Sequence, residues 1–226
     1  MLKFSIPKCL PVLAVSALLA ACVAPQKQTA GYDYTAFKSA KPRSILVLPP
    51  LNETVDVNAT NGMLSQMTMP LAESGYYVLP VAEVAETFRQ NGIALPVEMQ
   101  ATSPKKLREI FGADAVLYTK VTQYGSVYRV VDSNTSVSAT AKLVSLGTGD
   151  VLWQGTATAN GKELGNVDFG SGSIIGMMVQ AAVKQVAHSL ADESQAVAGL
   201  TSQRLLSAGQ PNGILYGPHS PKYGSD

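Results

Sequence analysis

The sequence predicts a single α/β domain, in which a mixed sheet combines an N-terminal βαβ unit with a C-terminal antiparallel meander, and a long helix packs on it. Three changes of pattern indicate this class. Up to residue 111, short apolar runs alternate with segments whose apolar residues recur every three to four positions. From Ala113 the apolar period falls to two, as in a sheet with one buried face. Beyond the glycine-rich residues 161–172, the helical period returns.

The βαβ unit comes first. The continuous apolar run Ser44–Leu48 predicts a buried strand. Asn58 or Thr60 can cap the helix that follows, and Pro70 is expected to break or kink it. The segment Tyr76–Leu79 predicts the second strand. The apolar face of the helix between these strands comprises Met63, Leu64, Met67 and Leu71.

Two further helices are expected before the meander. The segment Val81–Asn91 has helical periodicity and ends at an Asn-Gly pair, which favours helix termination. Ser103 is a good N-cap and Pro104 suits the first helical position, so another helix is expected from there to Phe111. Gly112 follows its last residue.

The meander is expected from Ala115 onward. A first strand covers Ala115–Tyr124, and Gly125-Ser126 turns the chain into a second strand over Val127–Val131. Asp132–Asn134 turns it again, and Gly147–Asp150 forms the last hairpin turn. The buried face of the strand between these two turns comprises Val137, Ala139, Ala141 and Leu143. One face of the last strand comprises Val151, Trp153 and Ala157.

The C-terminal part is expected to form the long packing helix. Ser173 can cap it, and a weaker helical pattern continues to Leu206, where the domain of residues 44–206 ends. Residues 207–226 are rich in Gly, Pro and Ser, which predicts a flexible tail without regular structure. The apolar stripe of the helix comprises Ile175, Val179, Ala182, Val183, Val186 and Leu190.

The N-terminus has the layout of a secretory signal peptide over residues 1–21, with a short basic segment, an apolar run and small residues. The segment Leu19-Ala20-Ala21-Cys22 resembles the lipobox of bacterial lipoproteins. That resemblance implies cleavage before Cys22 and attachment of lipid to its thiol. An ordinary signal followed by a chance cysteine is the alternative. Val23 stands where an Asp would resemble the inner-membrane retention signal, so the outer membrane is favoured.

Residues 22–43 are polar and small, and they predict a tether between the membrane and the domain. Tyr32, Tyr34 and Phe37 are the exceptions, and these aromatic side chains can instead pack onto the edge of the domain.

Composition excludes several classes of function. The chain of 226 residues has 17 basic and 16 acidic residues, and Lys3 and Lys8 precede Cys22, which leaves 15 basic residues against 16 acidic ones. A nearly neutral protein of this kind has no electrostatic basis for binding nucleic acid. The two cysteines, Cys9 and Cys22, leave none for a disulfide, a thiolate metal site or a cysteine nucleophile within the fold. No cofactor is expected.

Two apparent motifs are better explained structurally. Gly170–Gly176 opens a helix, but its spacing misses the dinucleotide fingerprint and Asp168 would repel phosphate. His188 has Asp192 one turn later, yet it lies opposite the apolar stripe, where a surface position is expected. His219 falls in the tail, so a histidine pair for metal is unsupported.

The strongest candidate for a functional patch is the loop after the first strand. It carries Asn52, Glu53, Asp56 and Asn58 at the end of the strand where α/β folds usually bind ligands. Solvated side chains without a function are the alternative. We therefore regard these four residues as candidate interaction residues.

Several segments resemble a family of bacterial lipoproteins of unknown function, which includes a meningococcal lipoprotein antigen studied as a vaccine candidate. The resemblance implies a fold similar to the amino-terminal domain of the Tol-Pal translocation protein and to curli-secretion-type lipoproteins, beside which members are often encoded. It implies no enzymatic activity and carries over no catalytic residues. The matching segments are Leu48–Asn52, Val55–Thr60, Pro70–Val81, Gly112–Tyr118 and Gly213–Pro218.

The leading hypothesis is a non-enzymatic outer-membrane lipoprotein that faces the periplasm and serves as an accessory or structural component of an envelope or secretion-type assembly. A curli-secretion-type lipoprotein is a candidate partner. The alternative is a periplasmic small-ligand or glycan binding module that uses the loops Asn52–Asn58 and Gly165–Gly172. A hydrolase that depends on His188 is a more distant third hypothesis.

Overall fold

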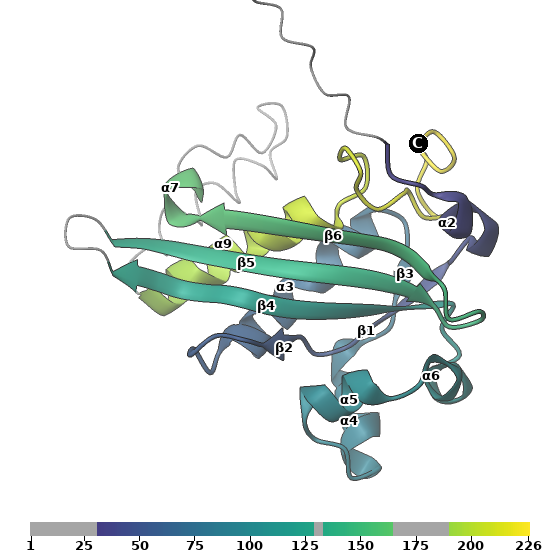
Figure 1. Ribbon diagram of the computed structural model, residues 1–226, viewed down its shortest axis with the longest axis horizontal. Coiled ribbons are helices and arrows are strands. Elements are labelled where there is room, and N and C mark those ends of the chain that lie inside the picture. The colour runs from purple at the N-terminus through teal and green to yellow at the C-terminus, as the bar shows by residue number, and fades with distance from the viewer. Residues whose placement is uncertain (1–30, 129–132, 165–189) are drawn as a thin grey trace, which may run out of the picture. The chain divides into compact units, whose positions relative to one another are not determined.

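The predicted fold class is confirmed by a computed structural model of the chain, which describes residues 31–128, 133–164 and 190–226 (Figure 1). The residues from Asp33 onward form one compact unit. Within the described residues, the strands form one mixed sheet in the order β3-β1-β4-β5-β6, and β2 pairs separately with β4.

The sheet joins a parallel part to an antiparallel part. Strand β1 pairs in parallel with β3 and β4, and β2 pairs in parallel with β4 farther along that strand. Strands β4, β5 and β6 form the antiparallel meander. The strand bounds are β1 Ser44–Val47, β2 Leu51–Asn52, β3 Tyr77–Val78, β4 Ala115–Tyr128, β5 Ser133–Ser145 and β6 Val151–Asn160.

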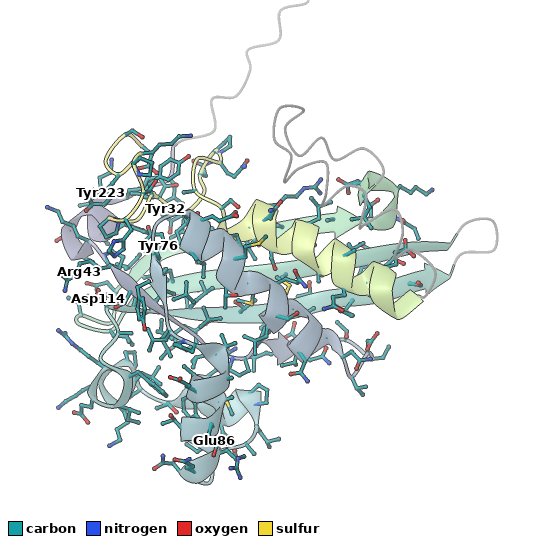
Figure 2. The ribbon with its side chains drawn as sticks, turned by 180° about the vertical axis from the view of Figure 1, so that it is seen from behind. Tyr32, Arg43, Tyr76, Glu86, Asp114 and Tyr223 are labelled. Atoms are coloured by element: carbon teal, nitrogen blue, oxygen red, sulfur yellow. The ribbon has the colours of Figure 1, made fainter. Side chains whose placement is uncertain are left out.

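Helices α3 and α9 pack against each other and cover one face of the sheet (Figures 1 and 2). Helices α4, α5 and α6 cover one end of the opposite face, and no other described helix covers the rest of that face of β4, β5 and β6. The helix bounds are α2 Thr35–Ala40, α3 Ala59–Glu73, α4 Val81–Gln90, α5 Pro96–Ala101, α6 Pro104–Phe111, α7 Gly161–Leu164 and α9 Leu190–Leu206.

The βαβ unit is confirmed, because α3 connects β1 to the parallel strand β3. Pro70 does not break α3, which continues to Glu73. The physical reason is its position near the C-terminal end, where a missing N–H donor removes one helical hydrogen bond and leaves the earlier turns intact. Gly75 then adopts a left-handed backbone with φ of 96°.

Helix α6 has the ends that the sequence predicts. The Ser103 hydroxyl accepts from the Lys106 backbone N–H, Pro104 lies at its start, and Gly112 adopts a left-handed φ of 66°. Helix α5 was not predicted. Its six residues are too few for a periodic pattern to stand out.

The meander has three strands, because Gly125-Ser126 is not a turn. Gly125 lies inside β4 opposite Ser136, with φ of 101°. The long pairing with β5 holds the chain extended through a conformation that glycine accepts without strain. The predicted extent of the turn at Asp132–Asn134 is also wrong in part, since β5 already begins at Ser133.

Val151 and Trp153 do not share a face, contrary to prediction. Trp153 pairs with Leu143 and Val151 pairs with Val144, so Leu152 is an extra residue in β6. A bulge of one residue reverses the side-chain alternation. Val151 is therefore 44% exposed, whereas Trp153 is 1% exposed.

Helix α9 packs on the sheet with apolar core residues, such as Val197 and Leu206, and with buried hydroxyl groups. The Thr201 hydroxyl donates to the Val137 carbonyl at 3.1 Å, which ties the helix to β5. Ser202 contacts the Met63 sulfur at 3.5 Å, which ties it to α3. The apolar stripe predicted from Ile175 to Val186 lies outside the described residues, as does its capping residue Ser173.

The segment before β1 packs on the domain over α2, so it is not a tether up to residue 43. Phe37 is buried, and the Tyr34 hydroxyl donates to the Gly213 carbonyl at 2.5 Å. The structure instead confirms the alternative, in which Tyr34 and Phe37 pack onto the domain edge. The aromatic rings gain more from burial than the polar composition of the segment suggests.

The C-terminal segment is docked, although it forms no helix or strand after Leu206 in the described residues. Ile214 and Leu215 are buried, and the Leu215 carbonyl accepts from the Tyr76 hydroxyl at 2.5 Å. The Gly217 N–H donates to the Ser74 carbonyl at 2.8 Å. The prediction of a flexible tail is therefore wrong, because these long-range contacts offset the conformational freedom that its composition favours.

Gly217→Ala is expected to lower the free energy of unfolding by about 1–3 kcal/mol, the usual cost of forcing extra volume into a packed site. A Cβ atom at Gly217 would lie 2.4 Å from the Gly75 carbonyl oxygen, which is backbone and cannot rotate away. Urea denaturation would measure the change. Gly31→Ala is the control, because a Cβ atom there meets nothing within 4 Å; equal stability of the two variants would contradict the expectation.

Candidate functional site

The four predicted site residues lie together where the chain passes from β2 to α3; we name residues 52–58, which include the last residue of β2, the β2–α3 loop. The loop leaves the sheet beside β4, because the Glu53 N–H donates to the Val121 carbonyl at 2.9 Å. It then reaches the start of α3 at Ala59. Two ordered elements therefore hold the ends of the loop.

The loop is closed by its own polar side chains. Asn52 Oδ1 accepts from the Thr54 N–H at 2.8 Å, and the Asn52 amide donates to the Asp56 carbonyl at 2.7 Å. Asp56 Oδ1 accepts from the Asn58 N–H at 2.8 Å. Such bonds to a backbone N–H two residues ahead are turns that Asn and Asp favour. Asn52 and Asp56 therefore have a structural role in ordering the loop.

Glu53 and Asn58 have different surroundings. The Glu53 carboxylate pairs with the Lys120 ammonium at 2.7 Å, with both side chains nearly half exposed. An ion pair of that exposure contributes little to stability. Asn58 precedes α3, but its side chain makes no capping bond. Asp56 lies close to β4, since a Cβ atom at Gly125 would be 3.5 Å from its Oδ2. Burial, and to a smaller extent the charge of Asp56, raises the pKa of Tyr124.

The loop exposes Val55 and Val57, which are not among the residues predicted from the sequence. Their side chains are 102% and 85% exposed. The sequence pattern that could have predicted their exposure is Thr54-Val55-Asp56-Val57, where polar residues that favour turns alternate with valines. An ordered loop thus presents two apolar side chains to solvent, which suits contact with another protein.

A separate groove of about 970 Å³ lies on the sheet face that the described helices leave uncovered. Its floor consists of two cross-strand rows, because Tyr118 pairs with Lys142 and Lys120 pairs with Thr140. Strand β6 extends both rows, with Gln154 opposite Lys142 and Thr156 opposite Thr140. The wall comprises Val97, Gln100, Ala101, Thr102, Ser103 and Pro104, and the rim includes Leu51, Gly149 and Val151.

The groove has a positive character. Lys120 and Lys142 line it, and none of the described lining residues is acidic. The Lys142 ammonium lies 5.5 Å from the centre of the Tyr118 ring. Burial raises the pKa of Tyr118, so the phenol stays neutral at physiological pH. The Gln100 amide on the wall is fixed by donating to the Pro49 and Thr119 carbonyls at 2.8 and 3.0 Å.

Other predicted sites fall outside the described residues: Cys22, Gly165–Gly172, Gly170–Gly176 and His188. No described residue of the β2–α3 loop lines the groove, so the groove does not join the two loops of the predicted binding module. In the described parts of the chain, no cluster of three or more His, Cys, Asp or Glu residues could hold a metal. None of the helices described is long and apolar enough to cross a membrane.

Comparison with known proteins gives a family and close relatives. The family model described as "Putative lipoprotein GNA1162-like" matches residues 32–219. The "Putative lipoprotein NMB1124/NMB1162" of Neisseria meningitidis serogroup B (strain ATCC BAA-335 / MC58) is 46% identical over 207 residues, which are 92% of this chain and 94% of the relative.

Solved structures add two similarities. The crystal structure of lipoprotein GNA1162 from Neisseria meningitidis is 49% identical, with a TM-score of 0.51, and the match covers 66% of this chain and 100% of that chain. A PelC dodecamer from Paraburkholderia phytofirmans is 16% identical, with a TM-score of 0.41 over 74% of this chain and 91% of that chain. The second similarity is too distant to indicate a shared function.

Asn52→Ala is expected to loosen the β2–α3 loop without unfolding the domain. The variant loses the acceptor for the Thr54 N–H and the donor to the Asp56 carbonyl. A hydrogen bond of about 0.5–1.5 kcal/mol corresponds to roughly 2- to 12-fold faster amide exchange at Thr54. Hydrogen exchange followed by NMR would measure this rate. Asn58→Ala is the control, because that side chain does not cap α3; the same acceleration in both variants would refute a specific role for Asn52.

Proposed function

The chain belongs to the GNA1162-like lipoprotein family, and from this premise we propose that it is a non-enzymatic lipoprotein of the outer membrane. In this proposal lipid on Cys22 holds the protein at the periplasmic side of the membrane. The folded unit then serves as an accessory component of an envelope assembly by docking to a partner protein. The fully exposed Val55 on an ordered loop is the observation that carries the docking step.

The sequence before the fold supports the anchor. Residues 1–21 have the signal layout, and Cys22 follows small residues as in a lipobox. Each buried methylene of an acyl chain contributes about 0.8 kcal/mol, and two or more chains give stable anchoring. Val23 in place of Asp supports the outer membrane over the inner membrane.

The anchor also limits the reach of the protein. The compact unit begins at Asp33, so residues 23–32 are the only link between Cys22 and that unit. Ten extended residues span at most roughly 35 Å. In this proposal Asp33 stays within that distance of the lipid anchor.

The β2–α3 loop supports docking to a protein. Burying a valine side chain contributes about 1.5–3 kcal/mol. The loop is ordered before binding by Asn52 and Asp56, so little conformational entropy is lost on docking. A partner with a shallow apolar pocket fits this loop, and a curli-secretion-type lipoprotein is the first candidate to test.

Cys22→Ala is expected to move the protein from the membrane fraction to the soluble periplasmic fraction, because the variant has no thiol to acylate. Fractionation of cells and mass spectrometry of the N-terminal peptide would measure both location and lipid. Cys9→Ala, within the signal segment, is the control and should leave the protein in the membrane. Retention of the Cys22→Ala protein in washed membranes would rule out Cys22 as the anchor.

The double variant Val55→Asp with Val57→Asp is expected to reduce crosslinked partner complexes in intact envelopes at least tenfold. Two valines at about 1.5 kcal/mol each are sufficient for that loss. The melting temperature should not change, because both side chains are exposed. Crosslinking followed by immunoblotting would measure the complexes.

Leu95→Asp is the matched control, since it makes the same kind of change at a residue that is 57% exposed elsewhere. The control should retain the complexes. If the loop variant retains them at the wild-type level, or if both variants lose them equally, the loop is not the docking surface.

A further inference from the structure

The sheet face that the described helices leave uncovered carries a compact block of hydrogen-bonding side chains, of which Lys120 also pairs with Glu53 of the β2–α3 loop. The pairing registers place Tyr118, Lys142 and Gln154 in one row and Lys120, Thr140 and Thr156 in the next. Side chains that pair directly across strands lie about 4.5–5.5 Å apart at Cβ, and diagonal neighbours lie about 7–8 Å apart. Lys120 and Lys142 are diagonal neighbours, so both ammonium groups can reach one extended ligand.

The charges of the groove select an anionic ligand. Lys120 and Lys142 line it, and no acidic residue is among its described lining residues. Glu53 already pairs with Lys120 at 2.7 Å. The ammonium of Lys142 instead lies over the Tyr118 ring at 5.5 Å, and no carboxylate among the described residues pairs with it. Lys142 should therefore contribute most of the attraction for an anion.

The apolar groups of the groove favour a peptide over a glycan. Sugar rings are commonly bound on exposed aromatic faces, but Lys142 covers the Tyr118 face. Val97 on the wall is 59% exposed, and Val151 on the rim is 44% exposed. Each can bury an apolar side chain of a bound peptide. Val151 is available only because the bulge at Leu152 turns it toward this face.

We propose that this groove binds an extended acidic segment of a partner protein, with carboxylates on Lys142 and Lys120 and apolar side chains on Val97 and Val151. Side-chain hydroxyls and amides of Thr140, Thr156 and Gln154 offer hydrogen bonds to the peptide backbone. The inference does not rest on the docking of Val55 and Val57, because neither valine is among the described lining residues of the groove.

Fluorescence anisotropy of labelled ten-residue peptides with the full-length protein in detergent tests the proposal. A peptide that alternates Glu and Val should bind saturably, and more weakly as salt increases. A peptide that alternates Gln and Val should bind at least tenfold more weakly. A hyaluronan decasaccharide, which is anionic but not a peptide, should compete poorly.

Lys142→Gln should weaken the binding of the Glu-Val peptide at least tenfold. Lys222→Gln is the matched control, because the Lys222 ammonium also lies over a tyrosine ring, that of Tyr216 at 5.6 Å. This control should bind within twofold of the wild type. Val97→Asp places a negative charge on the wall and should also weaken binding, with an unchanged melting temperature in all three variants.

Three outcomes would overturn the proposal. They are the absence of saturable binding of the Glu-Val peptide to the wild type, equal losses in Lys142→Gln and Lys222→Gln, and tighter binding of hyaluronan that depends on Lys142. Loss of the loop-dependent complexes would not affect these measurements, so failure of the groove and failure of the docking loop can be told apart.

Discussion

The backbone hydrogen bonds of β4 are the interaction on which the rest of the structure depends. This strand pairs in parallel with β1 and β2 along one edge and in antiparallel with β5 along the other. Val116 packs toward α4, α5 and α6, and the alternation of the strand places Ala115 and Leu117 toward α3 and α9. Both halves of the fold therefore share a single strand, and neither half has a complete core without it.

The two ends of the described unit close the same corner of the fold. Tyr34 and Tyr76 each donate to a carbonyl of the C-terminal segment, and Trp153 donates to the Asn212 carbonyl at 3.0 Å. Gly75 and Gly217 approach so closely that a side chain on either would meet backbone atoms. Figure 2 shows Tyr76 and Tyr223 in this corner. The corner thus joins α2, β3, β6 and the C-terminal segment, which lie far apart in the sequence.

The β2–α3 loop and the groove both adjoin the same part of β4. Lys120 lines the groove and also pairs with Glu53 of the β2–α3 loop, while Val121 holds the start of that loop by its carbonyl. The loop presents apolar tips and the groove presents cationic and hydroxyl groups, so the two surfaces suit different parts of a partner.

Local sequence patterns were sufficient to predict the fold class, the βαβ unit, the ends of α6 and the last hairpin turn, because each depends on local periodicity or on one capping residue. They also placed Asn52, Glu53, Asp56 and Asn58 in one loop, without showing that two of them order it. The position of Gly125 within a strand, the exposure of Val151 by the bulge at Leu152, and the burial of Phe37 and Leu215 follow from the three-dimensional fold and could not be read from the sequence. These features depend on strand register and on contacts between distant segments, whose free energy no local pattern records.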